Sequence, residues 1–465
     1  MSAAGALVVA VTLAGCGSTT FFAGRNLPPS GLVNRVMIAV QNPSPLAKGS
    51  LQIVDAFYDI RYAYNNINKT FPVGGFSGAL PVSIQNMPEE QTGAVYSSGD
   101  GSLVTISYAK ESSAGTQSGL NGVSSSIYIT RDQGYIIAAS QQEHVLTVVD
   151  KLGGSSYGLS LPGVYRVSVN PGGTVALAFV QNSNYVYYPR KLTAGETLDY
   201  SGGPSSWPMN AEDCEPQNAP VWCLFQAADA NGTPLTFNRP VKAVFSPDGG
   251  TAYVLNCGQE CGGTASSITL LPTAPMLFRV SQASGTLPGQ GSLTTIPIPG
   301  GASNALVTAS TMYVVGQQLQ TDGLFTGNLT VVNLANNTAS SPVGISDGAP
   351  GAPSRMILAD NNTLWVAMTK CNNGERYAKG QPYGCLTMFN TATDSVTLIE
   401  PYQGDATGIA DVEGLHKIYA VEGGQVYIFT TTDGTALDNQ YVTVTGTASD
   451  VAYIDAHSDS NNTVY

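Results

Sequence analysis

The sequence predicts an all-β fold, a single closed β-propeller built from four-stranded antiparallel blades. A strand–turn–strand unit recurs along the chain, no segment shows sustained helical periodicity, and turn-forming residues are abundant, with 52 Gly and 27 Pro among 465 residues. The apolar fraction of 43% is far too high for a disordered chain. A chain of this length usually forms two or three domains, but a closed ring of repeats accommodates it as one.

Each repeat shows the same local pattern. A strand of alternating polarity runs into a turn rich in Pro, Asp, Asn or Gly, and a second, apolar strand follows. Residues 164–180, 241–255 and 354–367 have this pattern, with turns at 170–173, 246–249 and 360–362. We letter the strands of a blade A to D from the centre outward, so that these tight turns join strand A to strand B.

Counting the predicted A strands gives eight blades. They are expected to start near residues 81, 125, 165, 241, 303, 354, 406 and 449. The last A strand has no outer strands after it, and the N-terminal strands at 35–40 and 51–55 have no inner partner, so the two ends should share one blade and close the ring. A pair of sandwich domains is the alternative, but no linker of changed composition divides the chain.

The second strand of several repeats carries a family resemblance. Tyr253-Val254-Leu255-Asn256 follows the turn Ser246-Pro247-Asp248-Gly249, and 313–316 and 365–368 are similar segments. The chain resembles YVTN-type β-propeller repeat proteins of the lactonase-like superfamily over nearly its whole length. The resemblance implies a propeller, usually of seven blades, so seven is the alternative to eight. The catalytic His, Arg, Glu or metal-binding residues of its lactone hydrolases have no residue-by-residue counterpart here.

The N-terminus is predicted to be a lipoprotein signal. An apolar stretch too short to span a bilayer ends in Leu13-Ala14-Gly15-Cys16, which resembles the lipobox of bacterial lipoproteins. The resemblance implies a signal peptide at 1–15 and a lipidated Cys16 with a tether at 16–31, which leaves 32–465 as the propeller domain that the repeats predict. No Lys or Arg precedes the apolar stretch, which departs from the usual signal pattern. A residue other than Asp after the Cys, here Gly17, implies the outer membrane of the cell envelope.

The six other cysteines fall into close pairs, which predicts three local disulfides in an exported protein. The pairs are Cys214 with Cys223, Cys257 with Cys261, and Cys371 with Cys385. Zinc is the competing interpretation, but none of the three histidines lies beside a cysteine pair, and we expect no metal.

Loop lengths distinguish the two faces of the predicted ring. The A-to-B turns are tight, whereas the B-to-C connections at 256–266, 316–327 and 370–384 are long, and we call the face that carries them the loop face. The loop between Cys371 and Cys385 contains Arg376, Tyr377, Lys379 and Tyr383. Cations beside aromatics suit a carbohydrate, a carboxylate or a partner protein, although a merely solvated loop has the same composition.

A polar residue precedes each A-to-B turn by four or five positions, while its neighbours along the strand are mostly apolar. These residues should face the central channel near the loop face, and they are Ser126, Arg166, Lys242, Asn304, Arg355, Thr407 and Asp450. Three cations on one ring would hold a carboxylate or phosphate. The alternative is a water-filled channel whose polar walls need no ligand.

The net charge of the chain and the motifs that it lacks exclude several classes of function. The net charge of −13 argues against a nucleic-acid partner. No phosphate loop, serine nucleophile elbow or histidine cluster is present, so we expect no cofactor. The sequence therefore predicts a non-catalytic envelope lipoprotein that binds an envelope or extracellular protein, or a polar or anionic small molecule, on its loop face and contacts the membrane only through its lipid. The alternative is a lactonase-type hydrolase with a site at the channel mouth.

Overall fold

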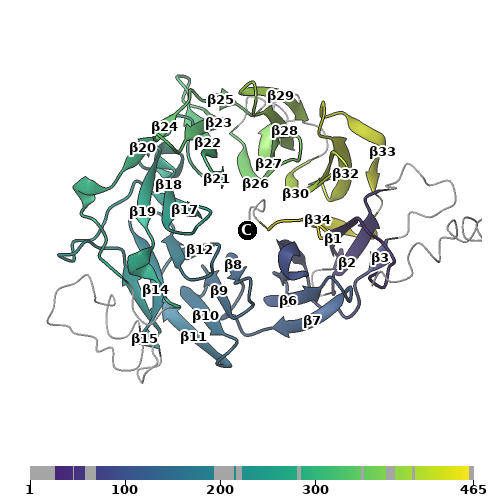
Figure 1. Ribbon diagram of the computed structural model, residues 1–465, viewed down its shortest axis with the longest axis horizontal. Coiled ribbons are helices and arrows are strands. Elements are labelled where there is room, and N and C mark those ends of the chain that lie inside the picture. The colour runs from purple at the N-terminus through teal and green to yellow at the C-terminus, as the bar shows by residue number, and fades with distance from the viewer. Residues whose placement is uncertain are drawn as a thin grey trace, which may run out of the picture.

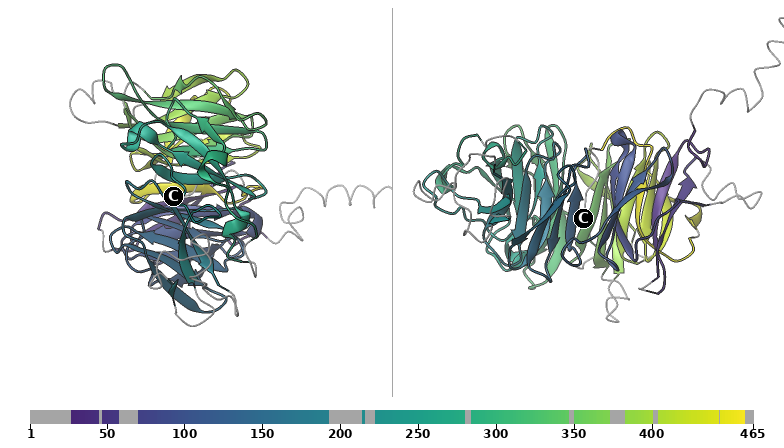
Figure 2. Two further views of the ribbon diagram at one scale, coloured as in Figure 1. Left: turned by 90° about the vertical axis from the view of Figure 1, so that its left-hand side faces the viewer. Right: turned by 90° about the horizontal axis from the view of Figure 1, so that it is seen from below.

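The computed structural model is an eight-bladed β-propeller, seen down the ring axis in Figure 1 and edge-on in Figure 2. It describes residues 27–44, 47–57, 70–192, 214–215, 222–279, 284–346, 350–372, 383–400, 404–442 and 444–459, without the side chains of 214–215, 372, 398–400 and 438–441. Within these residues the strands form eight antiparallel sheets, which confirms the predicted fold and the count of eight rather than seven.

The blades follow one another around the ring in chain order. The strands of each blade are given from the centre outward. Blade 1 holds β34 (Thr447–Tyr453), β1 (Arg35–Gln41), β2 (Ser50–Asp55) and β3 (Phe71–Pro72). Blade 2 holds β4 (Pro81–Met87), β5 (Thr92–Ser97), β6 (Ser102–Ser107) and β7 (Ser112–Gln117). Blade 3 holds β8 (Ser126–Ile129), β9 (Tyr135–Ser140), β10 (Val145–Asp150) and β11 (Ser155–Ser160). Blade 4 holds β12 (Val164–Val169), β13 (Ala176–Val180), β14 (Val186–Lys191), β16 (Trp222–Gln226) and β15 (Cys214–Glu215).

The second half of the ring repeats this order. Blade 5 holds β17 (Pro240–Phe245), β18 (Thr251–Asn256), β19 (Ser267–Pro272) and β20 (Thr295–Pro297). Blade 6 holds β21 (Asn304–Val307), β22 (Thr311–Leu319), β23 (Phe325–Asn333), β24 (Thr338–Ala339) and β25 (Val343–Gly344). Blade 7 holds β26 (Ala352–Leu358), β27 (Thr363–Asn372), β28 (Tyr383–Asn390) and β29 (Ser395–Glu400). Blade 8 holds β30 (Ala406–Val412), β31 (Lys417–Glu422), β32 (Gln425–Thr430) and β33 (Ala436–Val442). Short 3-10 turns are η3 (Pro88–Glu90), η6 (Gly258–Cys261), η7 (Ala274–Met276) and η8 (Gln290–Ser292).

The two ends of the chain close the ring, as predicted. The C-terminal strand β34 is the inner strand of blade 1 and pairs antiparallel with β1, for example Val36 opposite Tyr453 and Ile38 opposite Val451. In Figure 1 the yellow β34 lies beside the purple β1. Because every blade then has a neighbour on each side, the ring leaves no blade face uncovered.

The core lies between neighbouring blades and follows from the two-residue period of the strands. Along β13, Leu177 and Phe179 pack with blade 5, whereas Ala176 and Ala178 pack with blade 3. Opposite faces of one strand therefore enter different cores. Trp222 on β16 is fully buried, and its ring meets that of Tyr135 edge-on at a centroid distance of 5.8 Å.

Most A strands begin with a bulge that links neighbouring blades. The ladder between strands A and B shifts by one residue at Tyr165, Val241 and Ser354, between the flanking paired residues. Ser354 Oγ donates at 3.0 Å to Ala367 O of its own blade and at 2.7 Å to Ala406 O of the next. Ser125 and Ser449 make the same pair of bonds in blades 3 and 1. Three blade junctions are thus joined by a serine at the same position.

Two of the predicted disulfides are confirmed. Cys257 is bonded to Cys261 and Cys371 to Cys385. For the third pair, the strand register places Cys214 opposite Cys223, but the side chain of Cys214 lies outside the described residues. The signal segment at 1–15, Cys16 and most of the tether also lie outside them. None of the described helices has the length and hydrophobicity to cross a bilayer.

Candidate functional site: a cationic cavity in the channel

A cavity of about 560 Å³ lies in the channel at the end where the A strands begin. All eight blades contribute to its wall, because each A strand, or the residue just before it, reaches the axis there. The bulges place two successive residues of some strands in the wall, such as Tyr165 with Arg166 and Ser354 with Arg355. The volume falls within the ~300–1,000 Å³ range of small-molecule sites.

Five of the seven residues predicted to form the polar ring line this cavity. They are Arg166, Lys242, Asn304, Arg355 and Thr407. The other two are buried at blade junctions, where they bond the backbone of the next blade. Ser126 Oγ accepts from Val167 N at 3.2 Å, and Asp450 Oδ2 accepts from Ile84 N at 2.8 Å.

Thr407 lines the cavity from a different strand position than the arginine and lysine residues of the ring. The ladder of β30 shifts between Ala406 and Gly408, so Gly408 is the residue equivalent to Arg355 and Thr407 is the bulge residue. A side chain at Gly408 would collide with the carboxylate of Asp450. The Thr407 hydroxyl is buried and has no hydrogen-bond partner in the described part of the chain.

The three cations of the ring are held differently. Arg355 Nη2 lies 3.1 Å from Asp450 Oδ2 and both side chains are buried, while Lys242 Nζ donates to Asn304 Oδ1 at 2.9 Å. The guanidinium of half-buried Arg166 lies 5.7 Å from the ring centroid of Tyr165. The cavity wall also contains one carboxylate among its described residues, that of Asp405.

The pKa of Lys242 reflects its burial and the charges around it in the cavity. Burial, together with the charges of Arg166 and Arg355, lowers the pKa of Lys242 to about 7. Burial disfavours the charged form of a lysine, and nearby positive charges disfavour it further. Two other cations therefore act on this position inside a protein with a net charge of −13.

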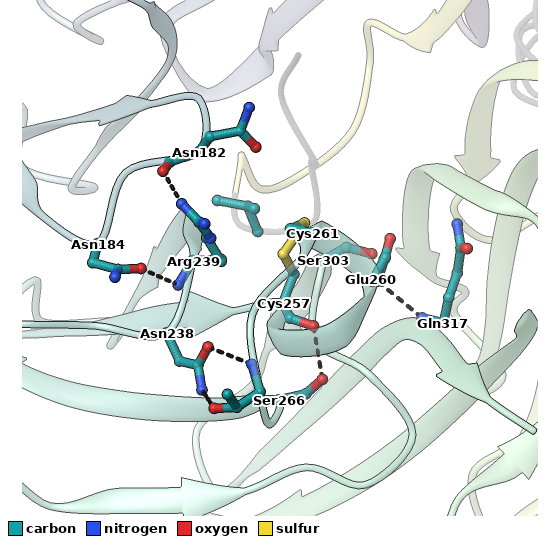
Figure 3. The surroundings of a disulfide bond; sticks show 12 residues. Asn182, Asn184, Asn238, Arg239, Cys257, Glu260, Cys261, Ser266, Ser303 and Gln317 are labelled. Atoms are coloured by element: carbon teal, nitrogen blue, oxygen red, sulfur yellow. Dashed lines mark hydrogen bonds between the residues drawn. A yellow bond between two sulfur atoms is a disulfide. The ribbon is translucent and has the colours of Figure 1, made fainter.

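Glu260, which sequence reasoning missed, lies next to this site. It sits in η6 inside the Cys257–Cys261 disulfide, and its Oε2 accepts from Gln317 N at 3.0 Å, as Figure 3 shows. Burial raises the pKa of Glu260 to about 7 against the opposing effects of the Gln317 N–H, the Ser303 hydroxyl and the Arg166 charge. The cysteine spacing marked the loop in the sequence, but nothing in it indicated that Glu260 turns toward blade 6.

A smaller chamber of about 190 Å³ lies deeper in the channel. Arg166 and Lys242 line both spaces, so they stand between them. Residues after β34 cross the chamber's far side, where Asp459 Oδ2 lies 3.0 Å from Arg131 Nε and Asp459 N donates to Glu89 Oε1 at 3.1 Å. His457 Nδ1 lies 2.8 Å from Glu413 Oε2 of blade 8. These contacts hold the C-terminal segment over the face opposite the loop face.

The other predicted binding group cannot be placed. Arg376, Tyr377 and Lys379 lie outside the described residues, and Tyr383 is half-buried at the start of β28. In the described part of the chain, no three His, Cys, Asp or Glu side chains come together as a possible metal site.

Comparison with known proteins supports the fold alone. No protein-family model and no curated protein sequence matches the chain. Dihydro-heme d1 dehydrogenase NirN, solved in complex with DHE, superposes with a TM-score of 0.51 at 10% identity over 92% of this chain and 79% of its own. Hydrazine synthase from Kuenenia stuttgartiensis gives 0.46 at 12% identity over 76% and 96%, and AztD from Citrobacter koseri gives 0.45 at 12% over 90% and 97%.

Proposed function

We propose that this protein is an exported, lipid-anchored β-propeller of the bacterial envelope that binds a small anion, a carboxylate or phosphate compound, in the channel cavity. The observation that carries the proposal is the convergence of Arg166, Lys242 and Arg355 on one cavity of an acidic protein. The lipobox-like Leu13-Ala14-Gly15-Cys16 supports the anchor and the YVTN-like strands support the repeat family. Two disulfides are consistent with an oxidising compartment.

Charge and hydrogen bonding in the cavity suit an anion. Arg166 presents a planar guanidinium that can bind a carboxylate or phosphate with two parallel bonds. The Thr407 hydroxyl adds a polar group to which no described residue bonds. An anion would also offset the charges of Arg166 and Arg355, which together with burial lower the pKa of Lys242. A partner protein on the loop face is compatible with this role, since the cavity opens there.

Calorimetric titration with succinate and with inorganic phosphate tests the proposal. We expect at least one of them to bind, and Arg166→Met to weaken that binding at least tenfold. Arg190→Met is the matched control, because Arg190 also lies over an aromatic ring, 5.8 Å from the centroid of Phe225, but on an outer strand. Binding of neither anion, or equal binding by the Arg166 variant, would refute the proposal.

The pH dependence of binding gives a second readout. Lys242 gains its charge as the pH falls through about 7, so anion affinity should rise between pH 8 and pH 6. Lys242→Met should remove most of that rise. A succinate affinity that does not change over this range in the parent protein would show that Lys242 takes no part in anion binding.

The hydrolase alternative has one observation in its favour. Glu260 and Lys242 both have a pKa of about 7, and both interact with Arg166, which is an arrangement suited to proton transfer near neutral pH. Incubation with a lactone panel, with and without divalent metal, separates the two functions. Turnover that is lost in Glu260→Gln would favour the enzyme over the binding protein.

A further inference from the structure

A second cavity, of about 540 Å³, opens between blades 4 and 5 and shares no residue with the channel cavity. Its wall comes from the turn after β13, the connection leading into β17, the end of β18, residues 262–264, and the outer strands β19 and β20. The B-to-C loop at 262–264 places it on the loop face. Its volume is within the range of small-molecule sites.

The chemistry of this cavity differs from that of the channel. Amide and hydroxyl side chains dominate its wall, including Asn184, Thr236, Asn238, Asn256, Gln290 and Thr295. The wall contains no carboxylate among its described residues, and the guanidinium of Arg239 donates to Asn182 O. Amides offer both donors and acceptors, and hydroxyls offer both on one oxygen.

Asn256 supplies an unsatisfied group at this cavity. The side chain is 1% exposed, and its Nδ2 donates to Thr269 Oγ1 at 2.9 Å and to Ser267 Oγ at 3.2 Å. Its Oδ1 is buried and has no hydrogen-bond partner among the residues that the structure describes. A buried acceptor of this kind is satisfied when a donor, such as a ligand hydroxyl, reaches it.

The wall is held in shape before any ligand arrives. Asn238 Oδ1 accepts from Thr264 N at 2.9 Å, and Ser266 Oγ donates to Cys257 O at 2.8 Å, so the Cys257–Cys261 loop is tied to the wall, as Figure 3 shows. On the far side, Gln290 bonds both the N–H and the carbonyl of Thr236, at 2.8 and 2.9 Å. A prearranged wall reduces the entropy lost on binding.

We propose that this cavity binds a neutral saccharide. Among the described residues of the wall, a cation would find no carboxylate and an anion would find only a guanidinium that already donates to Asn182 O. An apolar ligand would leave the amides and hydroxyls without partners. Each sugar hydroxyl both donates and accepts, so it can match an amide or hydroxyl of the wall, including Asn256 Oδ1.

Three neutral trisaccharides serve as probes, namely maltotriose, cellotriose and N,N′,N″-triacetylchitotriose, each titrated by calorimetry or ligand-observed NMR. At least one should bind. Thr295→Trp, at an exposed position of β20 on the cavity wall, should weaken that binding at least tenfold by filling the space. Thr338→Trp on β24 is the matched control, because Thr338 is also exposed on an outer strand, in the next blade.

A second variant excludes an effect of folding. Gln290→Ala removes the two bonds to Thr236 without adding bulk, and it should also weaken the saccharide while leaving the thermal unfolding temperature close to that of the parent. Arg166→Met should leave saccharide binding unchanged, which separates this site from the channel. The proposal is overturned if none of the three sugars binds at 10 mM, a probe concentration on the order of the weakest specific affinities, or if Thr295→Trp binds as the parent does.

Discussion

At the scale of single residues, Lys242 shows how a binding site can weaken the fold that carries it. Its pKa is about 7 in the folded protein, against 10.5 as the ordinary value. Between these values the unfolded chain holds a proton that the folded chain has released, so the stability of the protein falls as the pH is lowered from about 10.5 to about 7. Below about pH 7 Lys242 is charged in both the folded and the unfolded chain, so the free energy that its burial costs no longer changes with pH.

Replacing Lys242 by Met should therefore stabilise the protein. We expect a gain on the order of 2 kcal/mol at pH 7, after allowance for water in the channel, and hardly any gain at pH 11. Urea unfolding of both proteins at the two pH values measures it. Lys110→Met, at an exposed site, is the control and should show no such pH dependence. A destabilised Lys242→Met protein at pH 7 would mean that its hydrogen bonds outweigh the desolvation of its charge.

Residue positions could be predicted from the sequence as far as the strands are regular. Counting back from the turns placed Arg166, Lys242 and Arg355 at the channel, because each lies four or five residues before a tight turn. The same count selected the bulge residue Thr407 instead of Gly408, because the sequence does not show that β30 stays paired through Val412 and so has one more pair after its bulge than β12 or β17. Nor could it separate cavity residues from Ser126 and Asp450, which bond neighbouring blades through contacts between distant parts of the chain.

At the scale of single elements, the bulge at the start of the A strands is the device that joins blades. In blade 7 the ladder shift at Ser354 frees its hydroxyl to reach both Ala367 O and Ala406 O. The A-strand starts could be predicted because turn residues punctuate them. These serines could not, since serine is common in such turns and its partner lies in the next blade.

Ser354→Ala should destabilise the protein by about 1–2 kcal/mol, because the carbonyls of two buried residues, Ala367 and Ala406, lose the hydroxyl proton that they share. Chemical denaturation measures the change. Ser118→Ala, at an exposed site beside β7, controls for the loss of a hydroxyl and should change stability by less than about 0.5 kcal/mol. Equal stabilities for the two variants would show that the junction bonds are replaced by water.

Loops between elements were predicted less well than the elements. The 316–327 connection was expected to be a long loop, but β22 and β23 extend through it as a hairpin from Leu319 to Phe325. The residues there alternate too weakly in polarity to indicate strands, and the pairing of the two strands decides the outcome. The loop at 370–384, with Arg376, Tyr377 and Lys379, stays a prediction.

At the scale of the whole molecule, closure of the ring makes the stability of the fold depend on the last strand, β34. The residues of β34 pack with blade 8 through Val451 and Tyr453 and with β1 through the ladder, while Asp450 bonds both Arg355 of blade 7 and Ile84 of blade 2. One strand of seven residues thus contacts blades on both sides of the closure and the cationic cavity itself. This explains why the closure could be predicted from unmatched strands at the two ends, since an open ring would expose β1.

A protein of residues 27–446, which lacks β34, should not reach the folded state of a protein of residues 27–465. Removing β34 exposes the edge of β1 together with buried Ile38 and Val40, and it leaves Arg355 without Asp450. We expect a loss comparable to the ~5–15 kcal/mol that stabilises a typical domain. Trp222 and Trp365, both fully buried, report unfolding by fluorescence in a denaturant titration. A single cooperative transition at the same denaturant concentration in both proteins would mean that blade 1 is held by its outer strands alone. In that case the side chains of the polar ring would keep their positions without the charge of Asp450, and the pairing of Arg355 with Asp450 would not be what holds them.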